Sequence, residues 1–343
     1  MLTDELENVA LLADSQRRLV IRTIEVPEPG PKQVVVQVTH VAQNPTDVQS
    51  FDAAAFGDDS VYGCDFAGKV VKLGERVTKL SVGDVVAALV WGGEIKKLGA
   101  YARFTLADED VSFKIPPSLT PASASTIPLA ATTSLLALFS KDCLNINHEK
   151  KNSVLIWGGA SSVGQYAIQI ALLYSLTVVT TCSPKNFELV RRLGATHVFD
   201  YNTPDVADRI REVAPDLKYV FDTIGRGNTS TVSSRAADAD ATLCTVRPGK
   251  ENTENVPKSV KVTAVLVWTA FLKDHRYGRF HWPANQADHQ LCAEFYDMLP
   301  ELLATGKIKP NDVHLLHGLK SVSQGFQRHR EGEISGQKIV YEL

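Results

Sequence analysis

The sequence has little of what marks a secreted or metal-clustering protein. Its 343 residues contain only five cysteines, which stand far apart at Cys64, Cys143, Cys182, Cys244 and Cys292. An odd and dispersed set favours reduced, buried thiols over a disulfide framework. No two of them form a CxxC unit, so the spacing excludes a local zinc cluster.

Excess charge and long apolar runs are also lacking. The formal net charge of −3 provides no broad cationic field, which argues against nucleic acid or an anionic membrane as a partner. The N-terminal segment 1–16 carries acids and has no long apolar core, and no stretch reaches the roughly 18 apolar residues of a membrane span. We therefore expect a cytoplasmic protein that acts on a small molecule.

The segments of the chain follow two different patterns, and a length of 343 residues is enough for two domains. Residues 18–127 show short strands separated by turns, at 18–27, 32–44, 66–74 and 82–90. Beyond them, apolar strands alternate with helices, as in a doubly wound parallel sheet. These strands are expected at 154–158, 177–182, 197–200, 219–225, 241–246 and 260–268. The C-terminal part adds a helix at 286–307 and a strand at 338–343 that can return to the first sheet.

A glycine-rich turn, WGGASSVG at residues 157–164, joins the first of these parallel strands to a helix. Gly158 and Gly159 allow a tight turn, and Gly164 lets the helix pack closely on the sheet. Backbone N–H groups and the helix N-terminus there suit a pyrophosphate. We predict cofactor contacts at Gly158, Gly159, Ala160, Ser161, Ser162 and Val163. Ser161 replaces the middle glycine of GxGxxG, and a plain strand-to-helix turn is the alternative.

The residues after the second parallel strand indicate which cofactor binds. An NAD enzyme usually places an acid there, but the chain has Ser183, Lys185 and Asn186, and no acid before Glu188. Hydroxyl and cationic groups suit a 2′-phosphate, which a carboxylate would repel. We therefore predict NADPH rather than NADH. A solvated surface lysine is the alternative interpretation of Lys185.

Together these motifs resemble the zinc-independent medium-chain dehydrogenase/reductases, and most closely the trans-acting enoyl reductases of fungal polyketide pathways and their toxin-cluster relatives. The matching segments span nearly the whole chain, namely residues 44–47 (NPTD), 63–68 (GCDFAG), 82–86 (VGDVV), 128–133 (PLAATT), 181–201 and 332–343. The resemblance implies an α/β protein with a GroES-like β-rich catalytic domain (1–127 and 280–343) and a Rossmann domain (128–279).

The resemblance also implies roles for single residues. Ser183, Lys185 and Tyr201 match positions that bind NADPH. A half-exposed aromatic at a strand end is the alternative interpretation of Tyr201. Asn44, Thr133, Gly158 and Ile224 match segments around the nicotinamide and its ribose, and Pro45 of the same motif belongs to the cofactor contacts. Zinc-dependent relatives have a cysteine near Asn44 and a His-Glu pair where this chain has Cys64 and Asp65, so we expect no metal.

Without a Lewis acid, an enoyl thioester is an easier substrate than an alcohol, because its own carbonyl accepts the charge that arrives with hydride. The catalytic candidates are Asn44, Thr133 and Tyr62. Some relatives have a tyrosine that donates the proton, or a lysine just after NPxD. This chain has neither residue at the matching positions, which favours protonation by water. Tyr62 is the nearest tyrosine, with a core or wall position as its alternative.

A last feature is an aromatic stretch at residues 265–284, which contains Trp268, Phe271, Tyr277, Phe280 and Trp282. It is typical of a substrate-pocket wall or a partner surface, or of an insertion packed on its own domain. We expect His275, His281 and His289 to be loop residues without a metal, since they lack metal-ligand spacing.

The leading hypothesis is an NADPH-dependent enoyl reductase for a polyketide or acyl thioester, which a carrier protein of a polyketide synthase presents. A quinone oxidoreductase and a non-catalytic NADPH-binding protein are the alternatives, since fold does not determine function. We expect a monomer rather than a dimer.

Overall fold

The computed structural model describes residues 7–147, 149–277 and 280–343. The chain divides into unit 1, which holds Met1–Leu129, Ala270–Asn285 and Cys292–Leu343, and unit 2, which holds Ala130–Thr269 and Gln286–Leu291. The sequence-based boundary at residues 279 and 280 thus differs from the structure. Unit 1 takes the chain from Ala270 onward, where Lys273 and His275 both bond Glu94.

Unit 1 is built on a seven-stranded sheet whose centre is the long strand β3. Its order is β17-β18-β3-β5-β6-β8, and β7 also pairs with β3. These strands are β3 (Gln33–Ala42), β5 (Asp65–Leu73), β6 (Val85–Leu89), β7 (Phe104–Asp108), β8 (Ser112–Lys114), β17 (Asp312–His317) and β18 (Gln337–Glu342). A smaller sheet joins β1 (Asn8–Ala13), β2 (Leu19–Ile24) and β4 (Ser60–Val61).

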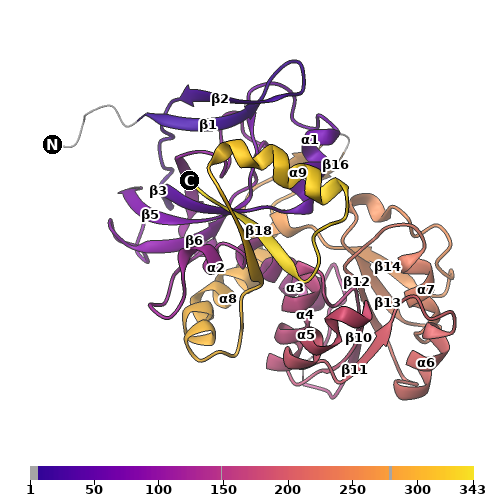
Figure 1. The fold of residues 1–343 in the computed structure, drawn as a ribbon. Helices are drawn as coiled ribbons and strands as arrows, with labels where there is room; N and C mark the ends of the chain where they lie inside the picture. Colours follow the sequence, from indigo (N-terminus) through magenta and orange to yellow (C-terminus); the bar gives the residue numbers. More distant parts are fainter. Residues whose placement is uncertain (1–6, 148, 278–279) are drawn as a thin grey trace. The chain divides into compact units, whose positions relative to one another are not determined.

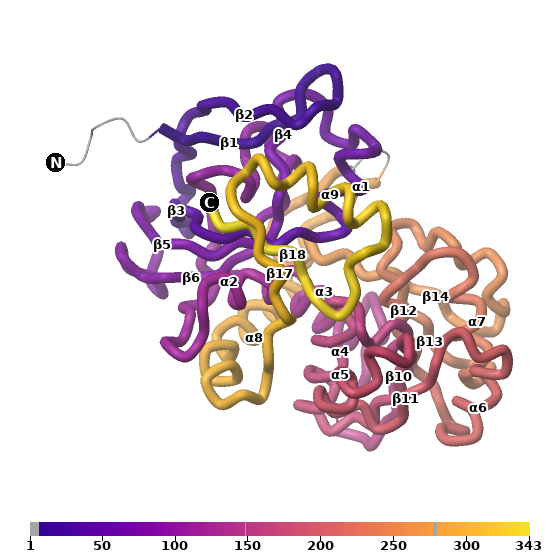
Figure 2. Tube along the Cα trace, viewed as in Figure 1, coloured from indigo at the N-terminus to yellow at the C-terminus, as the bar shows by residue number. Residues whose placement is uncertain are grey.

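The two ends of the chain meet in this sheet, as the sequence predicts. Strand β18 pairs antiparallel with β3, with Tyr341 opposite Val41. Figures 1 and 2 show the yellow C-terminal strand beside the indigo β3. Alternate apolar residues of both strands join one core, in which Val36, Val41 and Tyr341 are fully buried. Unit 1 therefore closes only when residues near position 340 have folded onto those near position 40.

The helices of unit 1 lie around this core. They are α1 (Pro45–Asp52), α2 (Pro121–Ala124), most of α8 (Gln286–Ala304) and α9 (Val322–Arg330). Pro45 opens α1, a position where a missing backbone N–H costs nothing. A short hairpin, β15 (His275–Tyr277) with β16 (Phe280–Trp282), belongs to the same unit. Sequence reasoning missed β1, β7, β8 and this hairpin, because they are short and lack clear turn signals.

Unit 2 contains a six-stranded parallel sheet in the order β11-β10-β9-β12-β13-β14. Its strands are β9 (Ser153–Trp157), β10 (Thr177–Cys182), β11 (His197–Asp200), β12 (Tyr219–Asp222), β13 (Thr242–Thr245) and β14 (Lys261–Ala264). In chain order this is 3-2-1-4-5-6, the Rossmann arrangement, so the predicted fold class is confirmed. The strand order reverses between β9 and β12, which is where open α/β sheets bind their ligands.

Helices cover this parallel sheet as expected for a doubly wound fold (Figure 1). They are α3 from Ala130 onward (α3 is Pro128–Phe139), α4 (Ser162–Leu173), α5 (Phe187–Arg192), α6 (Val206–Val213) and α7 (Thr229–Arg235). Val206 and Ile210 of α6 pack in one core with Leu155 of β9. Gly194 ends α5 with a positive φ of 105°, the helix-ending role that its position predicts.

One helical stretch among the described residues, Pro121–Phe139, is long and apolar enough to cross a membrane by length and composition. It is not a run of 18 apolar residues, since serine, threonine and proline interrupt it, and 83% of its window is buried within the protein, as for a core helix. The five cysteines are all free and buried, which confirms their prediction as reduced thiols.

Candidate functional site

The glycine turn of unit 2 has a conformation that side chains at three positions would disrupt. Gly158 has a φ of 85°, in the region that favours glycine. A Cβ on Gly159 would lie 2.1 Å from Thr180 Oγ1, and a Cβ on Gly164 would lie 2.3 Å from the Gly158 carbonyl oxygen. Each glycine therefore has the steric role that the sequence predicts, and the backbone forms a close cradle at the start of α4.

Ser161 has a structural role that explains its place in the motif. Its side-chain oxygen accepts a hydrogen bond from the Gly164 N–H (2.9 Å) and caps α4. The same oxygen lies 2.9 Å from Thr223 Oγ1, which also bonds the Trp157 carbonyl. Ala160, Ser162 and Val163 are half-exposed around this cap. Ser161 thus ties the turn to the end of β12, a link that a glycine cannot make.

The segment after β12 is fixed by a buried carboxylate that sequence reasoning missed. Asp222 accepts hydrogen bonds from the backbone N–H groups of Ile224 and Gly225, each at 3.0 Å. It also accepts from the hydroxyls of Thr229 and Ser230, each at 2.7 Å. These four donors replace the hydrogen bonds to water that the buried carboxylate loses. They hold Ile224, which is 36% exposed, at the strand edge where the sequence predicts the nicotinamide ribose.

The predicted phosphate-binding residues gather at the same edge of the sheet. Cys182 and Asp200 are register partners in the parallel pair β10–β11, so Ser183 and Tyr201 follow two neighbouring strand ends. Lys185 and Asn186 lie in the short 3-10 turn after Ser183, and Asn186 Nδ2 donates to Ser183 Oγ at 3.2 Å. Lys185 and Tyr201 are exposed. Hydroxyl, amide and ammonium groups thus stand together at this edge, with no acid among residues 183–187.

Asn44 of unit 1 is a buried residue that two carboxylates hold in place. Its backbone N–H donates to Asp47 Oδ2 at 2.7 Å, and its side-chain Nδ2 donates to Asp65 Oδ2 at 2.9 Å. Only 2% of Asn44 is exposed. The side-chain orientation is therefore fixed by the NPTD and GCDFAG motifs acting together.

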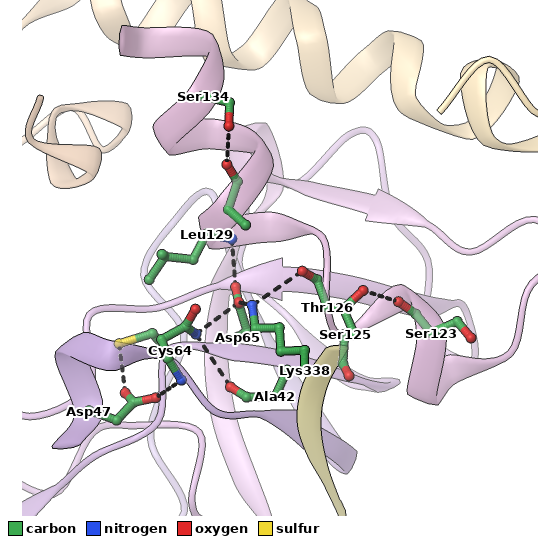
Figure 3. A network of polar contacts seen from close by, with 12 residues as sticks. Ala42, Asp47, Cys64, Asp65, Ser123, Ser125, Thr126, Leu129, Ser134 and Lys338 are labelled. Carbon is green, nitrogen blue, oxygen red and sulfur yellow. Dashed lines mark hydrogen bonds and ion pairs between the residues drawn. The ribbon is translucent and has the colours of Figure 1, made fainter. Parts of the chain in front are cut away.

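Cys64 and Asp47 form a buried thiol–carboxyl pair in the same cluster (Figure 3). Cys64 Sγ donates to Asp47 Oδ1 at 3.2 Å. Burial raises the pKa of Asp47 to about 7, although the Asn44 N–H opposes this shift. Burial also raises the pKa of the Cys64 thiol well above its ordinary range, and the charge of Asp47 adds to that effect. The thiol therefore keeps its proton near neutral pH.

Asp65 is paired with a lysine from the other end of the chain. Lys338 Nζ lies 2.6 Å from Asp65 Oδ2 and also donates to the Thr126 carbonyl at 3.2 Å. The Leu129 N–H bonds the second carboxylate oxygen at 2.6 Å. Figure 3 shows the Lys338 side chain, from β18, extending to Asp65. The ammonium neutralises the carboxylate inside the core of unit 1.

The other two catalytic candidates are both buried. Tyr62 is 1% exposed, and its hydroxyl lies 3.5 Å from the Ser50 carbonyl. It lines a cavity of about 210 Å³ in unit 1 together with Phe51. Thr133, which is 6% exposed, lies in α3 and belongs to unit 2. A catalytic role for either residue stays a prediction.

The chain is similar to known proteins along almost its whole length. Two family models match, an alcohol dehydrogenase GroES-like domain over residues 30–117 and a zinc-binding dehydrogenase over 162–276. The trans-enoyl reductase ACTTS2 of Alternaria alternata is 33% identical over 97% of this chain and 98% of its own length. The chain belongs to the trans-enoyl reductase family. A second member, traG of Penicillium crustosum, is 30% identical over 98% of this chain and 97% of its own.

A solved structure extends this likeness to the fold. An alcohol dehydrogenase superfamily protein of Novosphingobium aromaticivorans has a TM-score of 0.79 at 26% identity, covering 98% of this chain and 99% of its own. This trans-enoyl reductase family member therefore has the medium-chain dehydrogenase/reductase fold that its motifs indicate. Membership also supports a nicotinamide cofactor in general, and the glycine cradle of unit 2 fits the pyrophosphate of such a cofactor.

The second matching family model has zinc in its description, but the residues of this chain do not fit that metal. Cys64 holds its proton against Asp47, whereas a zinc ligand must be a thiolate. The Asp65 carboxylate is already occupied by the Lys338 ammonium. Within the described ranges, no three His, Cys, Asp or Glu side chains form a group able to hold a metal.

Proposed function

We propose that the protein is an NADPH-dependent reductase that delivers hydride to the activated C=C bond of an enoyl thioester. The observation that carries this proposal is the match at 33% identity along nearly the whole length of a trans-enoyl reductase. The steric cradle at Gly158, Gly159 and Gly164 supports it, because a dinucleotide pyrophosphate requires such close backbone approach.

The choice of NADPH is supported by the strand ends of β10 and β11. A 2′-phosphate carries negative charge and accepts hydrogen bonds, which Lys185, Ser183 and Asn186 are able to donate. Tyr201, exposed at the next strand end, offers a further hydroxyl. NADH would gain nothing from the lysine and would lack the acid that usually binds its ribose diol.

The residues of this chain support conjugate reduction rather than alcohol oxidation. NADPH bound at the turn supplies hydride for the β-carbon of the substrate. Charge then develops on the thioester oxygen, and hydrogen-bond donors lower the energy of that enolate. The candidate side-chain donor for this role is Thr133. Both N–H groups of the Asn44 side chain already donate, to Asp65 Oδ2 and to the Ala42 carbonyl oxygen, so Asn44 has a positioning role instead.

The finer biological setting also belongs to this proposal. The family name of the relatives suggests an enzyme that acts in trans on another protein's product. We place it in the cytoplasm as a monomer that reduces an acyl chain held by a carrier protein of a polyketide synthase.

The test is an assay of NADPH oxidation with crotonyl-CoA and, separately, with a small quinone. We expect NADPH consumption with the enoyl thioester and formation of the saturated acyl-CoA, with NADH a poorer donor. Oxidation of NADPH with the quinone alone would replace this proposal by a quinone oxidoreductase. Tight NADPH binding without turnover of either class would indicate a non-catalytic binding protein.

A further inference from the structure

The cavity of about 210 Å³ beside Tyr62 lies wholly within unit 1. The turn between β1 and β2 forms one of its walls, and the segment between α1 and β4 forms the other. Ala13 and Ala54 leave the space open, because their side chains end at Cβ. Phe51 and Tyr62 make an aromatic floor, with their rings packed edge to face and the centroids 5.8 Å apart. The floor therefore offers an apolar surface to a small molecule.

The wall between β1 and β2 is fixed by the carboxylate of Asp14. This carboxylate accepts hydrogen bonds from the backbone N–H groups of Gln16 (2.9 Å) and Arg18 (2.8 Å). The Arg18 guanidinium donates two more, at 3.0 and 2.8 Å. Asp14 is thus balanced by Arg18, and the charge that this turn presents to the cavity is that of Arg17.

The opposite wall is fixed by a lysine. Lys96 Nζ donates to the Phe56 carbonyl at 2.6 Å and to Ser60 Oγ at 3.2 Å. The segment that carries Lys96 is anchored in turn, because Glu94 Oε1 lies 2.6 Å from Nδ1 of His275. His275 opens β15 and is fully buried, so the expectation of a loop residue was wrong for it. The wall between α1 and β4 is therefore held from two sides.

Both walls contain residues in a strained backbone conformation. Arg17 has a φ of 57° and Ala54 a φ of 49°, in the left-handed region that residues with a Cβ seldom adopt. Such conformations persist only where surrounding contacts impose them, and they are frequent at ligand-binding sites. The Asp59 N–H also bonds the Ala13 carbonyl at 2.9 Å, which joins the two walls. The cavity is thus formed before any ligand arrives.

Two side chains of opposite charge stand at the rim of the cavity. Arg17 comes from one wall and Asp58 from the other, and both are exposed. Their neighbours Arg22 and Asp59 form an ion pair at 3.1 Å. Among the residues that the structure describes, the side chains of Arg17 and Asp58 have no such partner. A ligand that carries both a carboxylate and an ammonium group would pair with the two walls at once.

We propose that this cavity binds a free α-amino acid with an aliphatic side chain, such as leucine. The Arg17 guanidinium donates to the ligand carboxylate, Asp58 accepts from the ligand ammonium, and the aliphatic group lies against Phe51 and Tyr62. A cavity of about 150 Å³ holds benzene, so the volume of about 210 Å³ suits a molecule about half as large again. Tyr62 then has the wall position that was the alternative to its catalytic role. The proposal involves unit 1 alone and does not depend on enoyl reduction.

The experiment is a ligand-detected NMR titration of the full chain with leucine, leucinamide and 4-methylpentanoate. Leucinamide lacks the carboxylate and 4-methylpentanoate lacks the ammonium group, and at about pH 6.5 the amine of leucinamide is protonated. We expect leucine to bind with a Kd on the order of 0.1–1 mM, and each analogue at least about 5-fold more weakly. A folded wild type that does not bind leucine at about 20 mM would overturn the proposal. Equal affinity for leucine and either analogue would also overturn it.

Two variants assign the contacts at the rim. Arg17→Gln should lower the affinity for leucine to that for leucinamide, and Asp58→Asn should lower it to that for 4-methylpentanoate. Arg76→Gln is the control, because Arg76 is an exposed arginine of unit 1 outside the cavity. We expect this control to bind leucine as the wild type does. The same loss in Arg76→Gln as in Arg17→Gln would contradict a specific contact and overturn the proposal.

A third variant tests the cavity itself. Ala13→Leu places a larger side chain in the space and should abolish leucine binding, with circular dichroism as the check that the protein is folded. Leucine binding at the wild-type affinity by folded Ala13→Leu would show that the ligand lies elsewhere. If Ala13→Leu does not fold, the two rim variants still decide the proposal, because both replace exposed side chains.

Discussion

The buried pair of Lys338 and Asp65 allows a stability prediction to be worked from the structure. Both side chains are at most 3% exposed and lie 2.6 Å apart. Lys338→Met keeps the length of the side chain but removes the charge, so Asp65 keeps only its bonds from Asn44 and Leu129. Breaking such a pair from one side costs about 3–5 kcal/mol, because a buried carboxylate is left without its cation.

The assay is urea denaturation followed by circular dichroism, with thermal melting alongside. At about 2–4 °C per kcal/mol, we expect Lys338→Met to lower the Tm of unit 1 by about 6–20 °C. Lys72→Met is the control, since its pair with Glu28 is exposed and should change stability by less than about 1 kcal/mol. Asp65→Asn combined with Lys338→Met should recover much of the loss. A Lys338→Met protein as stable as Lys72→Met would refute the reasoning.

Three further predictions concern the carboxyl of Asp47 and the cofactor site. The pKa of Asp47 is raised in the fold to about 7, so the folded state favours the protonated carboxyl. Its contribution to the free energy of unfolding should be present below about pH 4 and decline between pH 4 and 7, by at most about 1.4 kcal/mol per pH unit. Denaturation across this range should show a smaller decline for Asp47→Asn; parallel curves would contradict the shift. Gly159→Ala should weaken NADPH binding at least about 10-fold in a fluorescence titration. Gly30→Ala, where a Cβ would meet only the flexible Gln33 side chain, should not. Lys185→Ala should weaken NADPH binding about 10–100-fold and NADH binding little. Lys261→Ala is the control, because Lys261 is exposed at the opposite edge of the sheet. Equal losses of affinity for both nucleotides would refute the assignment of Lys185 to the 2′-phosphate.

Local pattern was enough to predict the parallel sheet and its glycine turn. Strands 177–182 and 197–200 were predicted with the bounds that β10 and β11 have, because buried parallel strands appear as apolar runs. The roles of the glycines in the turn are predictable because the turn constrains only a few adjacent residues. Strand β14 was predicted too long, since Val267–Ala270 turns into a 3-10 helix despite its apolar sequence. Periodicity does not distinguish these two conformations over so few residues.

The buried polar pairs are not predictable from the sequence, because their partners lie in distant parts of the chain. Lys338 and Asp65 are 273 residues apart, and His275 and Glu94 are 181 apart. Asp65 and Lys338 each lie in a recognisable motif, but neither motif indicates its partner. Only the pairing of β18 with β3 and the folding of the β15–β16 hairpin into unit 1 bring the paired residues together. His275 was judged by its loop-like neighbours, among them Tyr277, whose side chain lies outside the described part of the structure. A histidine and an acid flanked by aromatic residues was the only signal available.

The most direct test of the central claim is the fate of a labelled hydride. The purified protein is incubated with crotonyl-CoA and NADPH deuterated on one face of C4, and the product is analysed by mass spectrometry and NMR. We expect saturated butyryl-CoA that carries a single deuterium at the β-carbon from one of the two C4 faces. Unchanged crotonyl-CoA with either label, from a folded protein that binds NADPH, would contradict the assignment as an enoyl reductase.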